Sequence, residues 1–315
     1  MNREILVGDV LEKIKEIPDK TIDCVITSPP YWSLRDYSVE GQWGLEPDFH
    51  QYLAKMGRLM DELRRVLKDT GTCWINLGDT YGGSGKGAGT ADCKESWRPD
   101  KRPKMNETIT AKSRVGIPER FYIRCIDAGW VARNHIPWIK ANCMPSSVQD
   151  RFTNKWESVF FFAKERKYFF NLDAVREEPL SGYGSKVAKK KKGGIRKGLA
   201  NMQQNNLRTY ALHEKREKGI PVNNCNPKGK NPGDVFHINT RPCKEAHFAT
   251  FPPELPEKIL KCSCPPNGTV LDPFFGAGTV GLVAEKLNLN WVGIELNPEY
   301  AEIAKKRIGC QQKLI

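Results

Sequence analysis

The chain has 315 residues, and its 50 lysine and arginine residues outnumber 37 aspartate and glutamate residues, which gives a net charge of +13. Hydrophobic residues make up 39% and charged residues 28% of the chain, a balance that predicts a globular protein with a sizeable core. No apolar run approaches the roughly 18 residues that cross a bilayer, no secretion signal opens the chain, and ten cysteines are too sparse for a disulfide scaffold. We therefore expect a reduced cytoplasmic protein that binds no membrane, with nucleic acid as the first candidate partner for its positive charge.

Segments typical of strands and helices alternate along the chain, which indicates an α/β fold with a parallel sheet. The clearest helix spans 49–66, where leucine, methionine and valine residues recur at helical spacing, and Gly71 is expected to end it. A further helix at 299–308 follows the capping pair Asn297-Pro298. The phenylalanine run 160–162 is most simply a core strand, which we expect to pair with 130–139 near a sheet edge. We expect strands at residues 5–9, 23–27, 72–77, 130–139, 159–162, 269–271 and 291–294.

The positive charge concentrates in one segment. Between residues 186 and 233, thirteen lysine and arginine residues face only two glutamates, for a local charge of +11. The segment is rich in Gly, Asn and Gln and lacks apolar periodicity, which is typical of a solvated linker. The same composition suits a surface that neutralises phosphates while amide side chains reach base edges. The candidate DNA-binding residues are Lys189, Lys190, Lys191, Lys192, Arg196, Lys197 and Arg208.

A glycine-containing pattern, Asp-Pro-Phe-Phe-Gly-Ala-Gly-Thr at 272–279, directly follows a predicted strand. Its glycines allow a tight turn and a close approach of the backbone to a ligand. Asp272, and Glu295 at the end of the next strand, could hold the two hydroxyls of a ribose. The glycines, with Gly281, also fit the dinucleotide pattern G-x-G-x-x-G, although the 37 residues after the second glycine leave no room for another nucleotide half. A turn without a ligand is the simpler alternative.

A second pattern, Ser28-Pro29-Pro30-Tyr31, directly follows the apolar strand 23–27. Two consecutive prolines carry no backbone donor and stiffen the chain, so their carbonyl oxygens become fixed acceptors. Tyr31 offers a flat aromatic face beside them. Alone, this tetrapeptide would be read as a turn that ends a strand, with a tyrosine in the core.

Together the two patterns resemble the beta class of S-adenosylmethionine-dependent DNA methyltransferases, which modify exocyclic amino groups. In that family the Ser/Asn/Asp-Pro-Pro-Tyr/Phe motif comes first, a target-recognition segment follows, and the Phe-x-Gly-x-Gly motif comes last. This chain has the same order over nearly its whole length. The resemblance implies catalytic roles for Ser28, Pro29, Pro30 and Tyr31. It also implies contacts with S-adenosyl-L-methionine, by Asp9 near the adenine and by Glu295 at the ribose. The contacts that it implies at the methionine end are those of Asp272, Phe274, Gly276, Gly278 and Thr279. Phe251 and Glu254 would belong to a helix over 251–260 that closes the cofactor pocket.

The resemblance also implies a Rossmann-like methyltransferase sheet of seven strands in permuted order, with the basic segment inserted for target recognition. We expect residues 1–180 to form the catalytic part, 181–240 the recognition segment and 241–315 the cofactor-binding part. Both motifs then lie at neighbouring carboxyl ends of strands, where open α/β sheets bind ligands. The partners we consider are double-stranded DNA, a second copy of the chain and a cognate restriction endonuclease, in the cytoplasm of a prokaryotic or phage-infected cell.

The chemistry of the first motif suits an amino nitrogen, whose lone pair is delocalised into the base. We expect Ser28 and the Pro29 carbonyl to accept hydrogen bonds from its N–H groups. We expect Tyr31 to stack on a base that is flipped out of the duplex. The serine leans towards N4 of cytosine, with N6 of adenine as the alternative. An RNA methyltransferase and a non-catalytic nucleic-acid-binding module remain open at this point.

Two further interpretations rest on cysteines. The pair Pro242-Cys243 is reminiscent of enzymes that methylate cytosine C5 through a thiolate, but it follows the basic segment and would leave Ser28 to Tyr31 without a role. Cys243, His247, Cys262 and Cys264 do not have the spacing of a common zinc site. We therefore expect no metal and treat these cysteines as incidental.

Overall fold

The computed structural model describes residues 3–82, 109–143, 145–178, 226, 228–241 and 251–312. The chain forms two compact units, one of Met1–Asn171 with Gly233–Ile315 and one of Leu172–Pro232. The smaller unit includes the 3-10 turn η4 (Leu172–Val175) and an antiparallel bridge between Glu177 and Lys230. The seven predicted DNA-binding residues lie outside the described residues. The smaller unit overlaps the segment 181–240, whose role in target recognition stays a prediction.

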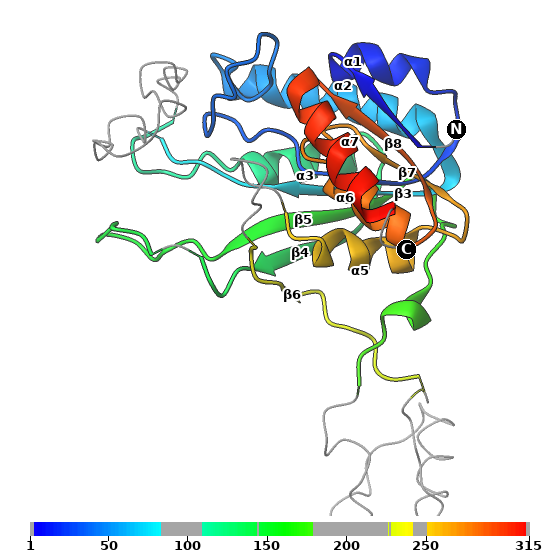
Figure 1. Cartoon of the computed structure of the whole chain (residues 1–315). Coiled ribbons are helices and arrows are strands. Elements are labelled where there is room, and N and C mark those ends of the chain that lie inside the picture. Colours follow the sequence, from blue (N-terminus) through cyan, green and yellow to red (C-terminus); the bar gives the residue numbers. More distant parts are fainter. Residues whose placement is uncertain are drawn as a thin grey trace, which may run out of the picture. The chain divides into compact units, whose positions relative to one another are not determined.

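Among the described residues, eight strands form one sheet in the larger unit. Neighbouring strands run parallel except β5, which is antiparallel to both β3 and β4. The predicted pairing of 130–139 with 159–162 is therefore confirmed. The eighth strand, absent from the prediction, is a two-residue edge strand that no periodicity could show. Across the sheet the order is β1 (Arg3–Val7), β8 (Asn290–Glu295), β7 (Thr269–Asp272), β2 (Ile22–Thr27), β3 (Leu67–Leu77), β5 (Trp156–Ala163), β4 (Val131–Ile139) and β6 (Phe236–His237) (Figure 1).

The two faces of the sheet are distinguished by strict alternation of side chains along the strands. In β5, Phe160 and Phe162 pack near Phe121 of α3 (Ile117–Asp127), whereas Phe161 stacks on Trp74 with ring centroids 4.0 Å apart. The phenylalanine run is thus a core strand, as predicted, and it contributes to both faces. Residues of β8 divide in the same way between the α2 side and the α6 side.

The amphipathic helix predicted at 49–66, α2 (Phe49–Val66), is confirmed in full. Asp48 caps its first turn by accepting a hydrogen bond of 2.9 Å from the His50 amide. Gly71 does not end it, because the chain turns extended at Leu67 and Gly71 lies within β3. Among the described residues, no helix combines the length and apolar character that crossing a membrane requires. The other helices are α1 (Val10–Lys13), the 3-10 turn η1 (Ile14–Glu16), α5 (Glu254–Ser263), α6 (Thr279–Lys286) and α7 (Pro298–Gln312).

The parallel strands β1, β8, β7 and β2 end along one edge of the sheet. Val7 at the end of β1 lies opposite Glu295, and Asp272 at the end of β7 lies opposite Gly293 of β8. The loops that follow these strands therefore meet, although they come from the two ends of the chain. Open parallel sheets bind ligands at this edge.

The close packing of β8 makes a first prediction. A Cβ atom at Gly293 would lie 2.4 Å from the ring of Phe275, which is stacked on Trp291 at 5.2 Å. Because the ring cannot retreat, we expect Gly293→Ala to lower the free energy of unfolding by about 1–3 kcal/mol. Gly309→Ala in α7, with open space around it, is the control and should be neutral or slightly stabilising. Urea unfolding measures both, and equal midpoints would contradict this packing.

Candidate active site

A pocket of about 610 Å³ lies at the carboxyl ends of β1, β8, β7 and β2 and brings the two sequence motifs together. Glu254 and Gly278 are the two predicted site residues within the described chain that do not line it. The predicted site residues that line it are Asp9, Ser28, Pro29, Pro30, Tyr31, Phe251, Asp272, Phe274, Gly276, Thr279 and Glu295.

The carboxylate of Glu295 organises the glycine loop. It accepts hydrogen bonds from the Gly276 amide at 2.7 Å and from the Asn297 amide at 2.8 Å. Gly276 has a φ of +50°, in the left-handed region that glycine tolerates best. Burial raises the pKa of Glu295, while the two amides oppose that shift. A carboxylate has about four acceptor sites, so two remain for hydroxyl groups of a ligand.

Asp272 is buried at the end of β7, next to the end of β2. Its Oδ1 atom accepts hydrogen bonds from the Thr27 hydroxyl at 2.7 Å and from the Phe274 amide at 3.1 Å. Burial outweighs these two donors and raises the pKa of Asp272 to about 7. The carboxyl is therefore poised to lose or keep a proton near neutral pH, depending on the charge of what enters the pocket.

Thr279, the first residue of α6, has a hydroxyl group suited to contact a ligand. Its Oγ1 atom is buried in the pocket wall and has no hydrogen-bond partner among the described residues. Such an orphan costs free energy unless a ligand satisfies it. Gly278 acts differently, because its φ is +75° and a Cβ there would lie 2.8 Å from Ala304. The glycine lets α6 pack on α7, and a contact of Gly278 with the cofactor stays a prediction.

The remaining predicted cofactor residues surround the rest of the pocket. Asp9 caps α1 by accepting a hydrogen bond of 2.8 Å from the Leu11 amide, so its carboxylate is held in place. Glu254 forms an ion pair with Arg241, and Arg241 itself lines the pocket. Phe274 meets the edge of Trp43 at 5.2 Å between ring centroids. Asp9, Arg241, Trp43 and Phe274 thus all contribute to the pocket lining.

Side-chain contacts hold the Ser28–Tyr31 motif in place. The Tyr52 hydroxyl donates a 2.9 Å hydrogen bond to the Pro30 carbonyl, which fixes the turn against α2. The ring of Tyr31 lies on Gly78, where a Cβ would come within 2.4 Å of it. Burial, reinforced by the nearby Glu157 carboxylate, raises the pKa of Tyr31, so its hydroxyl stays protonated. Stacking of Tyr31 on a base stays a prediction.

Two residues that the sequence analysis missed complete the motif. Asn76 Nδ2 donates to the Ser158 carbonyl at 3.1 Å, which points its Oδ1 atom towards the Ser28 hydroxyl 3.3 Å away. The Tyr31 hydroxyl donates to Glu157 at 2.8 Å, or to Asn76 at 2.9 Å. With its hydrogen directed to Asn76, the Ser28 oxygen presents its free lone pairs to a donor. An asparagine in the otherwise apolar run Trp-Ile-Asn-Leu was the available signal.

Glu157 is itself held by Lys140, whose Nζ atom donates to it and lies 4.2 Å from the ring centroid of Trp138. All three residues line the pocket, and they come from β4, β5 and the turn after β4. No local pattern connects them, because they meet only when the antiparallel strands pair.

The cysteines give no support to a thiolate or metal site. Cys243 and His247 lie outside the described residues. Burial raises the pKa of Cys262 to about 11 and that of Cys264 to about 12, which disfavours the thiolate. Within the described ranges, no three His, Cys, Asp or Glu side chains are grouped to hold a metal.

Comparison with known proteins identifies the family. The model of the N6/N4 DNA methylase family matches residues 22–306. The type II methyltransferase M.XycI of Xanthomonas campestris pv. cyanopsidis is 39% identical over 305 residues, which cover 96% of this chain and 87% of that protein. M.SmaI of Serratia marcescens is 36% identical over 306 residues, covering 97% and 90%.

Solved structures share the fold. The cytosine-N4-specific PvuII DNA methyltransferase superposes with a TM-score of 0.63 at 20% identity, covering 98% of this chain and 86% of that one. A proposed DNA modification methylase from Thermus thermophilus, complexed with S-adenosyl-L-methionine, has a TM-score of 0.58 at 20% identity, covering 98% and 94%. The chain therefore belongs to the N6/N4 DNA methylase family, and it is a site-specific DNA methyltransferase whose cofactor is S-adenosyl-L-methionine.

Proposed function

We propose that this methyltransferase modifies the exocyclic N4 atom of cytosine, after the base is flipped out of duplex DNA. The observation that supports this most is the orientation of Ser28. The Ser28 hydroxyl can donate its hydrogen to Asn76 at 3.3 Å or to the Tyr31 hydroxyl at 3.5 Å, and in either case the serine oxygen keeps lone pairs for an incoming amino group. A serine at the head of the motif resembles the N4-cytosine subgroup, and N6 of adenine is the second candidate.

Asp9, Asp272, Thr279 and Glu295 are the residues that we assign to the cofactor. The spare acceptor sites of Glu295 suit ribose hydroxyls, and the unsatisfied Thr279 hydroxyl suits a polar group at the methionine end. Bound there, S-adenosyl-L-methionine supplies an electrophilic methyl group on a sulfonium. A cluster of carboxyl groups suits this cation, because it lowers the cost of placing positive charge in a pocket.

Ser28 and the Pro29 carbonyl act on the amino group. By accepting hydrogen bonds from its two N–H groups, they draw the nitrogen towards a tetrahedral shape and expose its lone pair. The bound cofactor would supply the methyl group: its sulfur–carbon bond would break as the nitrogen–carbon bond forms, and the nitrogen would then release one proton to water. The rigid turn, fixed by Tyr52 at 2.9 Å, supports catalysis because preorganised acceptors need no reordering during reaction.

We assign sequence reading to the basic segment 181–240, and phosphate binding to its lysines and arginines. The type II relatives support pairing with a restriction endonuclease that reads the same site, a pairing that protects the host from its own nuclease. Modification-sensitive sequencing of DNA from a host that expresses the enzyme identifies the site.

The product tests the proposal most directly. Nucleoside mass spectrometry of treated duplex DNA should show N4-methylcytosine. Ser28→Ala should lower kcat by about a hundred-fold, because a preorganised partner is lost. Cys243→Ser is the control and should stay active, since no thiolate takes part. N6-methyladenine would select the second candidate, and 5-methylcytosine with an inactive Cys243→Ser enzyme would overturn the mechanism.

The raised pKa of Asp272 predicts a proton linked to cofactor binding. Its pKa near 7 leaves the carboxyl mostly protonated at pH 6. A bound cation favours the carboxylate and lowers that pKa, so binding should release close to one proton at pH 6 and much less above pH 8. Calorimetry at pH 6 in two buffers of different ionisation enthalpy measures the release. Glu295 also has a raised pKa, so Asp272→Asn isolates the contribution of Asp272 and should remove most of the effect.

Salt dependence tests the recognition segment. If six to ten phosphates are bound, affinity for duplex DNA should fall roughly 10³–10⁵-fold between 50 and 200 mM salt. Replacing the four lysines 189–192 with alanine should weaken the salt dependence, because the negative slope of log K against log salt should become shallower by up to about 4. Full sequence-specific methylation by an enzyme without residues 186–233 would instead make the segment a linker.

A further inference from the structure

The hairpin between β4 and β5 forms one rim of the active site. A second cavity of about 270 Å³ adjoins the first, and the two share Tyr31, Lys140 and Glu157. The hairpin residues Asn154 and Lys155 line this second cavity. In Figure 1 the hairpin (green) extends beyond the strands that it joins. The hairpin therefore lies beside the pocket that we assign to the base.

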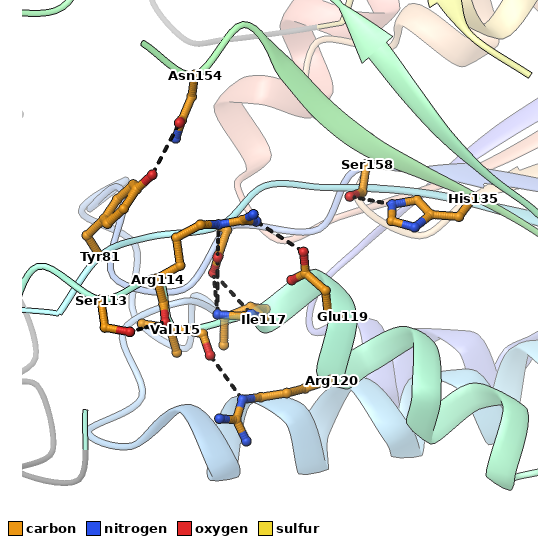
Figure 2. Close-up of polar contacts among 12 residues, drawn as sticks. Tyr81, Ser113, Arg114, Val115, Ile117, Glu119, Arg120, His135, Asn154 and Ser158 are labelled. Carbon is orange, nitrogen blue, oxygen red and sulfur yellow. Dashed lines mark hydrogen bonds and ion pairs between the residues drawn. The ribbon is translucent and has the colours of Figure 1, made fainter. Parts of the chain in front are cut away.

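Contacts with a neighbouring loop brace the tip of this hairpin. The Tyr81 hydroxyl donates a 3.2 Å hydrogen bond to Asn154, as Figure 2 shows. The Arg151 guanidinium lies 4.1 Å from the centroid of the Tyr81 ring. Lys112 pairs with Asp150 at 2.5 Å. Three contacts thus hold the part of the hairpin loop that leads into β5.

Phe152 at the braced tip is 97% exposed, more than any other large hydrophobic side chain among the described residues. Exposure of a full aromatic ring to water is unfavourable, because its apolar surface is hydrated instead of packed. Arg151 and Lys155 flank it, and both are exposed. An aromatic ring between cations is suited to nucleic acid, whose bases stack on rings and whose phosphates bind cations. It is poorly suited to an apolar protein face or a lipid interior.

We propose that Phe152 enters the base stack of the duplex and fills the gap left by the flipped base. Arg151 and Lys155 bind the phosphates on either side of that gap. This inference rests on the proposed function, because only an enzyme that extrudes its target base leaves such a gap. Arg151, Phe152 and Lys155 lie in the larger unit of the chain.

Photocrosslinking tests the contact without using activity. A photoreactive benzoylphenylalanine in place of Phe152 should crosslink the full-length enzyme to fragments of unmethylated genomic DNA. The control is the same replacement at Ile123 of α3, which is 57% exposed and lies outside the hairpin. Crosslinking at 152 that does not exceed that at 123, or that joins two protein chains, would overturn the proposal.

Phe152→Ala separates stacking from charge. Loss of the ring should weaken binding to the mapped duplex site roughly five- to a hundred-fold, with no change in the salt slope. Lys155→Ala should lower that slope by about 0.9, since one phosphate contact is lost. A duplex with an abasic site opposite the target, where the base is already unpaired, should restore much of the activity of Phe152→Ala.

These outcomes can be separated from those of the proposed function. Crosslinking from position 152 together with a product other than N4-methylcytosine leaves this inference standing and changes only the target atom. If N4-methylcytosine forms, position 152 does not crosslink to DNA and Phe152→Ala binds DNA as the wild type does, then the role of Phe152 in the base stack is overturned while the proposed function stands. Thermal unfolding of Phe152→Ala should match the wild type, because the ring is almost fully exposed in the folded protein.

Discussion

Glu295 connects the three loops on which the active site depends. Its carbonyl accepts the Gly8 amide at 2.9 Å, and its carboxylate accepts the amides of Gly276 and Asn297. The loops after β1, β7 and β8 are therefore held by one residue at the end of one strand. A buried carboxylate is costly unless hydrogen bonds satisfy it, so these loops and Glu295 stabilise one another. The shape of the cofactor pocket follows from this arrangement.

A single hydrogen bond also joins the two motifs that the chain order separates. The Thr27 hydroxyl, one residue before Ser28, donates to Asp272 at 2.7 Å across 245 residues of sequence. The residue that precedes the Ser28–Tyr31 motif and the acid that begins the glycine motif thus bond to each other where β2 and β7 end. In a parallel sheet the order of the segments along the chain can change while the strand order across the sheet stays the same. The permuted sequence therefore still builds a methyltransferase site.

The proposals divide the work among three surfaces. The pocket at the strand ends holds the cofactor and the reacting nitrogen, the hairpin carrying Phe152 stabilises the opened duplex, and the segment 181–240 reads the sequence. Asn76 and Tyr31 can each accept the hydrogen of the Ser28 hydroxyl, and Tyr31 is held in turn by Glu157, which Lys140 contacts. The rigidity of this network is what the proposed mechanism needs, because the amino group is a weak nucleophile.

The sequence alone determined the α/β class, the helix at 49–66 and the residues of both motifs, because periodicity, prolines and glycines act locally. It also predicted the pairing of β4 with β5. The tertiary structure decided what depends on contacts between distant segments: the eighth strand, the packing of α6 on α7 at Gly278, and the partners Asn76, Glu157 and Lys140. Asn76 and Glu157 lie in strands, and Lys140 in the turn after β4, where local sequence patterns predict burial but not neighbours. Which side chains meet across paired strands is set by register, and register is fixed only when the sheet forms.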